Sequence, residues 1–224
     1  MAADKAVRHV RVHPEACAVV DLAVAADWLA DGGIVAFPTE TVYGLAVDPR
    51  SEPAVERLFA LKGRALRLAL PLVAPSIEAV ELALGPLDSR SRQLAGGFWP
   101  GPLSLIVPAP AAIAREVHGG GGTVAVRVPS HPVARAVAQA AGGLVTATSA
   151  NRHGQSPATR ADELGVIADD PRVFVVDGGP APGGLPSTIV DARPEVPMLV
   201  RAGAVPWERV LELLSKRPGL TLEG

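Results

Sequence analysis

The 224-residue chain is poor in the residues that mark several specialised classes of protein. Its one cysteine, Cys17, excludes an internal disulfide framework and a multi-cysteine zinc site. Aromatic residues make up only 4% of the chain, which disfavours the stacking platforms that bind single-stranded nucleic acids. The 21 basic and 23 acidic residues nearly cancel, so the overall charge argues against a general polyanion binder.

Long uninterrupted apolar runs are also missing. The most apolar stretch, residues 68–87, contains three prolines and two glutamates, so we do not expect it to cross a membrane. The first ten residues lack the apolar centre of a signal peptide. We therefore expect a cytoplasmic protein that makes no membrane contact.

Glycine and proline are abundant, with 23 and 22 copies, and they separate alternating strand and helix patterns. We predict strands over 7–12, 34–37, 70–73, 103–107, 123–128, 144–148, 173–176, 188–190 and 198–200. We predict helices over 15–30, 51–61, 76–84, 88–94, 132–141 and 206–214. This alternation predicts one α/β domain over residues 1–224, built on a mixed sheet with flanking helices.

Polar clusters follow several of the predicted strands, at the position where α/β folds bind ligands. Residues 37–45 place three hydroxyls and a carboxylate between apolar stretches, which suits either a ligand loop or a threonine-stabilised turn. Lys62 and Arg64 flank Gly63 after a predicted helix. The two cations either complement the helix dipole or point into one cleft as a phosphate clamp.

A third cluster lies within the strand at 123–128. Thr123 and Arg127 are four residues apart, so they share one face of the strand with Ala125 between them. An arginine in an apolar strand is costly to bury without a partner. The sequence leaves open whether that partner is a structural carboxylate or a bound anion.

Three further clusters are rich in small residues. Residues 146–151 and 154–157 suit either close approach of a ligand to the backbone or ordinary turn chemistry. Residues 183–191 and 199–203 each resemble a structural turn more than a site when taken alone.

Taken in order, these clusters resemble the YrdC-like, or threonylcarbamoyl-AMP synthase, family over about residues 32–203. The landmarks are Pro-Thr-Glu-Thr-x-Tyr-Gly-Leu, Lys-x-Arg, Phe-Trp-Pro-Gly-Pro-Leu, Val-x-Val-Arg-x-Pro, Thr-Ser-Ala-Asn, Ser-Thr-Ile-Val-Asp and Arg-x-Gly. The resemblance implies a twisted sheet around a large concave basic cleft. It also implies an enzyme that joins L-threonine, bicarbonate or CO2, and ATP into threonylcarbamoyl-AMP and releases pyrophosphate. A separate transferase then places the threonylcarbamoyl group on adenosine 37 of tRNA.

The resemblance further implies a role for individual residues. Those implied to hold threonine are Thr39, Arg127, the backbone of Ala147, and Ser187. Those implied to hold ATP are Lys62, Arg64, Thr123, Ser149, Asn151, Ser156 and Arg201. Lys62 and Arg64 would also position the reacting phosphate and carbamate without a covalent nucleophile. Mg²⁺ would bind through the ATP phosphates rather than through protein ligands.

The chain departs from the family pattern beside the implied amino acid site. Ala65 replaces a proline, Leu68 and Ala69 stand in a normally polar stretch, no histidine follows, and Pro186 replaces a glutamate. Two alternatives to this enzyme stay open. One is an RNA-binding module of the same fold that contacts tRNA or double-stranded RNA. The other is a divergent carbamoyl-adenylate-forming relative, with another amino acid or carbamoyl phosphate as substrate.

Overall fold

The computed structural model describes residues 8–63, 69–152 and 154–216. The strands are β1 (His9–Arg11), β2 (Ile34–Pro38), β3 (Tyr43–Ala46), β4 (Leu72–Val73), β5 (Leu103–Pro108), β6 (Thr123–Arg127), β7 (Val145–Thr146), β8 (Thr148–Ser149), β9 (Val173–Asp177), β10 (Thr188–Asp191) and β11 (Met198–Arg201). The α-helices are α1 (Ala23–Ala30), α2 (Glu52–Lys62), α3 (Ile77–Leu84), α4 (Ser89–Phe98), α5 (Pro132–Ala140), α6 (Val166–Asp169) and α7 (Trp207–Ser215). Short 3-10 helices span Val19–Leu22 and Ala161–Glu163.

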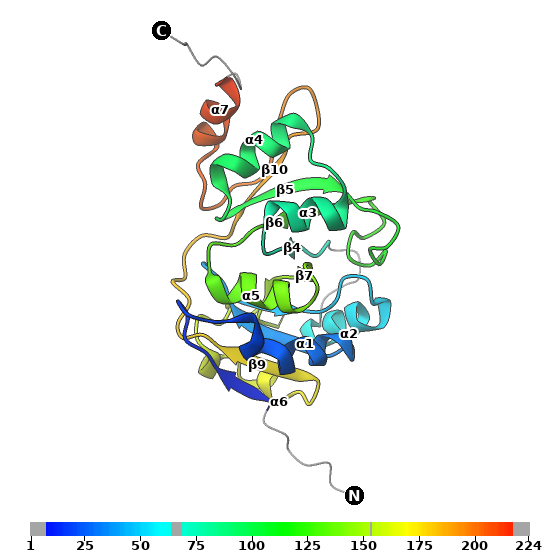
Figure 1. The fold of residues 1–224 in the computed structure, drawn as a ribbon, viewed down its shortest axis with the longest axis vertical. Coiled ribbons are helices and arrows are strands. Elements are labelled where there is room, and N and C mark those ends of the chain that lie inside the picture. Colours follow the sequence, from blue (N-terminus) through cyan, green and yellow to red (C-terminus); the bar gives the residue numbers. More distant parts are fainter. Residues whose placement is uncertain (1–7, 64–68, 153, 217–224) are drawn as a thin grey trace, which may run out of the picture.

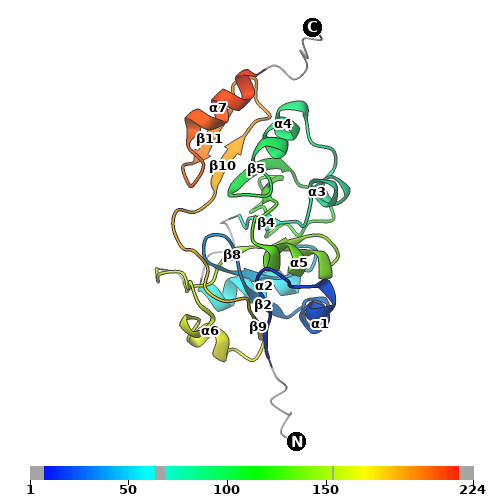
Figure 2. The ribbon, with the colours of Figure 1, turned by 60° about the vertical axis from the view of Figure 1, so that its left-hand side comes forward.

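The strands form two mixed sheets, which confirms the α/β class but not the predicted single sheet. One sheet has the order β1-β9-β2-β3-β8, and the other has the order β11-β10-β5-β6-β4-β7. In Figure 1 the six-stranded sheet occupies the upper half of the molecule and the five-stranded sheet the lower half. The turned view of Figure 2 shows α3 and α4 beside the six-stranded sheet.

The strand predicted over 144–148 divides at Ala147, and this division separates the two sheets. β7 pairs with β4, whereas β8 pairs with β3 of the other sheet. At the division, the Ala147 N–H donates to the Pro71 carbonyl at 2.8 Å, and the Thr146 hydroxyl accepts the Val47 N–H at 3.0 Å. A short strand pattern such as Leu-Val-Thr-Ala-Thr cannot reveal that its backbone groups find partners in different sheets.

β2 contributes to both hydrophobic cores because it is buried on both faces. Val35 and Phe37 pack in the core that contains residues of α1 and α5. Ile34 and Ala36 point to the opposite face and join the larger core. This alternation follows the two-residue period of a strand.

Two local predictions need correction. The predicted helix over 15–30 begins later, with the 3-10 turn at Val19–Leu22, because the Asp21 carboxylate caps the Ala18 N–H at 3.0 Å. The predicted loop over 37–45 contains most of β3, which pairs antiparallel with β2. The chain reverses direction at residues 39–42, and β3 begins directly after this turn. The polar residues of the segment had suggested a loop throughout. No described helix has both the length and the apolar character needed to span a bilayer.

Candidate functional site

A cavity of about 560 Å³ is lined by residues from both sheets. Its volume lies within the range of small-molecule pockets. It brings together seven of the residues implied to bind threonine or ATP: Thr39, Thr123, Arg127, Ala147, Ser149, Ser187 and Arg201. On β6, Thr123, Ala125 and Arg127 all line the cavity, so the predicted shared face of this strand is confirmed.

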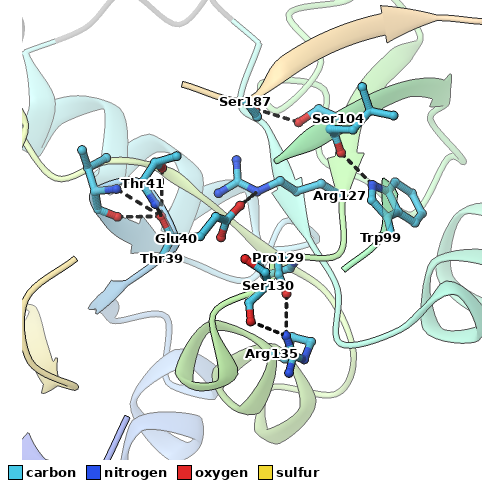
Figure 3. Close-up of polar contacts among 12 residues, drawn as sticks. Thr39, Glu40, Thr41, Trp99, Ser104, Arg127, Pro129, Ser130, Arg135 and Ser187 are labelled. Carbon is cyan, nitrogen blue, oxygen red and sulfur yellow. Dashed lines mark hydrogen bonds and ion pairs between the residues drawn. The ribbon is translucent and has the colours of Figure 1, made fainter. Parts of the chain in front are cut away.

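The segment between β2 and β3 is a turn held by the Thr39 side chain. The Thr39 hydroxyl donates to the Val42 carbonyl at 2.7 Å and accepts the Thr41 N–H at 3.2 Å. Its oxygen also lies 3.1 Å from the Thr41 hydroxyl (Figure 3). Both threonines are buried, and both line the cavity. The threonine-stabilised turn is therefore present, and its hydroxyls also form part of the cavity wall.

Arg127 forms a buried ion pair with Glu40, the residue that follows Thr39. The Nε atom of Arg127 lies 3.1 Å from a carboxylate oxygen of Glu40, and the two side chains are 8% and 10% exposed (Figure 3). The contact lacks hydrogen-bond geometry. Burial lowers the pKa of the Arg127 guanidinium, and the Glu40 charge partly opposes that shift. A structural carboxylate partner is thus present, while Arg127 still lines the cavity.

A second arginine of the cavity, Arg201, ends β11 and contacts Ser187, the residue before β10. The Nη2 atom of Arg201 donates to the Ser187 carbonyl at 2.7 Å and to the Ser187 hydroxyl at 3.0 Å. The Ser187 hydroxyl is also 3.0 Å from that of Ser104 on β5 (Figure 3). Burial, and then the neighbouring charge of Arg127, lower the pKa of Arg201. Two guanidiniums that repel each other form a favourable place for an anion.

Lys62 ends α2 and is only 4% exposed. Its Nζ donates to the carbonyl of Ser149, to the carbonyl of Asn151 at 2.8 Å and to the side-chain oxygen of Asn151 at 3.2 Å. Gly63 has a φ of +60°, the turn expected after the helix. A buried ammonium needs such acceptors. Lys62 therefore supports the segment that carries Ser149, and it lies outside the described cavity lining.

Asn151 and Ser156 also lie outside the described cavity lining. The Asn151 side-chain oxygen is 2.5 Å from the Ser149 hydroxyl, whereas Ser156 is exposed. Arg64 lies outside the described residues, so its predicted place in the site stays a prediction. Within the described ranges, no group of three or more His, Cys, Asp and Glu side chains is arranged to hold a metal ion.

The family model Sua5_yciO_yrdC, described as "Telomere recombination", matches residues 27–203. The chain belongs to this family. The threonylcarbamoyl-AMP synthase of Bacillus subtilis is 36% identical over 190 residues, which cover 84% of this chain and 55% of that protein. The enzyme of the same name from Pyrococcus abyssi is 35% identical over 193 residues, covering 86% and 57%. The chain thus spans a little over half the length of these two relatives.

Solved structures of the family have the same fold. P. abyssi Sua5 complexed with L-threonine superposes with a TM-score of 0.83 at 33% identity, covering 92% of this chain and 59% of that one. Escherichia coli YciO superposes with a TM-score of 0.75 at 22% identity, covering 88% and 95%. The second likeness shows the fold alone. The family resemblance inferred from the ordered motifs is confirmed.

The departures from the family pattern fall partly on the cavity wall. Ala69 and Pro186 line it with apolar surface, whereas Ala65 and Leu68 lie outside the described residues. Two cavity-lining residues, Tyr43 and His118, were given no role from the sequence. Tyr43 was visible within its motif, but nothing near His118 marked that residue as part of a site.

Tyr43 and Trp99 support the surroundings of the cavity. The Tyr43 hydroxyl lies 2.7 Å from the Gly179 carbonyl and 3.3 Å from the Asp177 carboxylate. Burial and the nearby Asp177 charge raise the pKa of Tyr43. The Trp99 indole N–H donates to the Leu103 carbonyl at 2.6 Å, next to Ser104 (Figure 3). Trp99 thus helps to hold the start of β5, consistent with a scaffold role for the Phe98–Leu103 motif.

Proposed function

We propose that this chain joins L-threonine, CO2 or bicarbonate, and ATP into threonylcarbamoyl-AMP and releases pyrophosphate. The observation that carries the proposal is the shared cavity. Two sets of residues line this one cavity. Thr39, Arg127 and Ser187 are assigned to threonine, and Thr123, Ser149 and Arg201 are assigned to ATP. The names of the two relatives and the threonine complex of P. abyssi Sua5 support this choice of substrates.

The reaction needs positioning and charge rather than a covalent enzyme intermediate. The neutral threonine amine forms a bond to the carbon of CO2 and loses one of its two protons to solvent, which gives the carbamate. Starting from bicarbonate, that proton leaves as part of one water molecule. A carbamate oxygen then forms a bond to the α-phosphorus of ATP while the bond to pyrophosphate breaks. Substituted amino acid and nucleotide are both anions, so a site that holds them together must offset their repulsion.

The two arginines of the cavity are suited to that task. We assign the threonine carboxylate to Arg127, whose planar guanidinium offers a forked pair of donors. Thr39, the Ala147 backbone and Ser187 would hold the rest of the amino acid. The Ala147 N–H is already donated to Pro71, so its carbonyl is the group left for the ligand.

We assign the ATP phosphates to Arg201, with Ser149 and Thr123 as neutral donors. The Nε and Nη2 atoms of Arg201 are engaged with Ser187, which leaves Nη1 to reach a phosphate. Lys62 would act mainly by holding the Ser149–Asn151 segment in place. Arg64, Asn151 and Ser156 remain assigned to ATP from the motif resemblance, and Mg²⁺ would enter with ATP as its phosphate complex.

The test is pyrophosphate release by the purified protein with ATP and bicarbonate, comparing L-threonine with every other common amino acid. We expect release that depends on threonine. Equal rates with serine, or without an amino acid, would contradict the proposal and favour the divergent relative. Salt-dependent binding of tRNA without any ATP turnover would favour the RNA-binding module instead.

A matched variant tests the assignment of Arg127. Arg127→Lys keeps the positive charge but removes the forked donor geometry. We expect it to raise the KM for threonine while leaving the KM for ATP within about twofold, because only one charge-assisted contact is altered. An unchanged threonine KM would remove Arg127 from the threonine site.

The proposed product implies a following reaction, in which another enzyme uses it. We propose that a tRNA threonylcarbamoyl transferase consumes the adenylate, that any contact between this chain and tRNA is weak, and that the protein acts in the cytoplasm. Transfer of label from radioactive threonine to tRNA, only when the transferase is added, tests this order.

A further inference from the structure

Glu40 is the one charged residue of the Pro-Thr-Glu-Thr motif, and no role in the proposed reaction uses it. We infer that Glu40 is a positioning residue, which holds Arg127 by its Nε atom so that the terminal nitrogens face the amino acid. This inference deepens the proposed function and rests on it.

The position of Glu40 is set by the turn on which it lies. Thr39 on one side of it is 2% exposed, and its hydroxyl bonds to both Thr41 and Val42. The Glu40 side chain is 10% exposed, and Figure 3 shows it directed at the Arg127 guanidinium. Burying a carboxylate here without a cation would be costly, so the pairing is favoured strongly.

The contact reaches a particular part of the guanidinium. Nε of Arg127 lies 3.1 Å from Glu40, and Nε is the buried guanidinium nitrogen. Nη1 and Nη2 make no hydrogen bond to any residue in the described ranges, while Arg127 lines the cavity. A ligand carboxylate can therefore bind the two terminal nitrogens while Glu40 keeps the inner one.

The ion pair also joins the two halves of the cavity. Glu40 follows β2 of the five-stranded sheet, and Arg127 ends β6 of the six-stranded sheet. Thr39 and Ser187, both assigned to threonine, lie on these different halves. A charge contact between the sheets fixes the guanidinium relative to the Thr39 turn, as precise positioning of a ligand requires.

A competing arrangement makes the opposite prediction. Glu40 could serve as an internal carboxylate that occupies the anion site until substrate displaces it. Removing Glu40 would then strengthen threonine binding. If Glu40 instead positions Arg127, removing it weakens threonine binding, because the freed guanidinium loses its fixed direction.

The experiment compares the wild-type protein with Glu40→Ala and Glu40→Gln. Glutamine keeps the size of the side chain that covers Nε but removes its charge, so it should rescue only part of the effect. We expect Glu40→Ala to raise the threonine KM about tenfold, the size of a lost charge-assisted contact, and Glu40→Gln to raise it about threefold. The KM for ATP should stay within about twofold in both variants, because Glu40 faces the arginine assigned to threonine.

A second readout does not depend on catalysis. In protein labelled with ¹⁵N-arginine, the Arg127 Nε–H signal is assigned through Arg127→Lys. It should exchange with solvent about ten times faster in Glu40→Ala than in the wild type, because truncating Glu40 uncovers the buried Nε. Glu81→Gln is the matched control, because it breaks the Glu81–Arg92 ion pair away from the cavity. It should change neither readout.

The outcomes separate the inference from the proposed function. Equal Nε–H exchange in wild type and Glu40→Ala overturns the inference, as does a threonine KM that is unchanged or lower. A third result is faster Nε–H exchange in Glu40→Ala while even the wild-type protein shows no threonine-dependent release of pyrophosphate. The contact between Glu40 and Arg127 would then stand. That result would refute the proposed function and, with it, the role toward threonine.

Discussion

Gly203 has the tightest backbone approach to the candidate site, and replacing it with alanine tests the described geometry directly. An added Cβ would lie 2.2 Å from the Pro186 carbonyl oxygen and 2.6 Å from backbone atoms of Ser187 and Thr188. Ordinary contacts at such positions begin near 3.4 Å. The segment 186–188 must therefore shift by about 1.2 Å, the difference between these distances.

The shift would act on the cavity through Ser187. This residue bonds to Ser104 and Arg201, so its displacement changes two walls together. Forcing a packed backbone apart costs about 1–3 kcal/mol of unfolding free energy. Misplacing a substrate-positioning group by about 1 Å costs on the order of a hundredfold in turnover. We expect both effects in Gly203→Ala.

The assay pairs urea unfolding with threonine-dependent pyrophosphate release. Gly96→Ala is the matched control, because Gly96 lies inside α4 with nothing within 4 Å of an added Cβ. That substitution should leave turnover unchanged and raise the free energy of unfolding by about 0.5–1 kcal/mol, the helix preference of alanine over glycine. If Gly203→Ala keeps the stability of the wild type, the described packing is refuted, whether or not its turnover falls.

Three further predictions concern buried ionisable groups. Arg127→Leu should cost about 3–5 kcal/mol in urea unfolding because it strands the Glu40 carboxylate, and adding Glu40→Leu should recover most of that loss; a double variant no more stable than the single one would contradict this. Tyr43 is the chain's one tyrosine, so absorbance at 295 nm should show no phenol titration near its ordinary pKa of 10.0 while the protein stays folded. Burial disfavours the charged imidazolium and lowers the pKa of His131 below its ordinary 6.5. Above pH 6.5 the imidazole is neutral in both states, and the folded protein keeps its full stability. As the pH falls from 6.5 toward the lowered pKa, the unfolded chain takes up the proton first, so stability is lost. The stability difference between wild type and His131→Gln should accordingly increase from pH 5 to pH 7; a constant difference would exclude His131 as the source.

Much of the local structure could be predicted because it follows from short-range patterns. The alternation of Thr123, Ala125 and Arg127 placed all three on one face, since a strand repeats every two residues. Gly63 marked the end of α2 because glycine adopts the left-handed conformation found there. The order of motifs was also sufficient to identify the family, because each motif spans only a few neighbouring residues.

Other features of the site depend on residues far apart in the chain. Lys62 bonds to Asn151, 89 positions away, and the sequence pattern gave no sign of this contact. The break at Ala147 was invisible for a similar reason. Its two flanking strands pair with β4 and β3, which lie far earlier in the chain and in different sheets.

The sequence by itself determined the α/β class, most helix and strand positions, the family and the set of polar residues available for chemistry. These depend on backbone preferences and periodicity, which act over a few residues. The tertiary structure alone decided that there are two sheets, that Glu40 pairs with Arg127 between them, and that Lys62 supports the Ser149 segment. Those outcomes require each buried charge and backbone group to find a partner, and the partner is chosen by how distant segments pack.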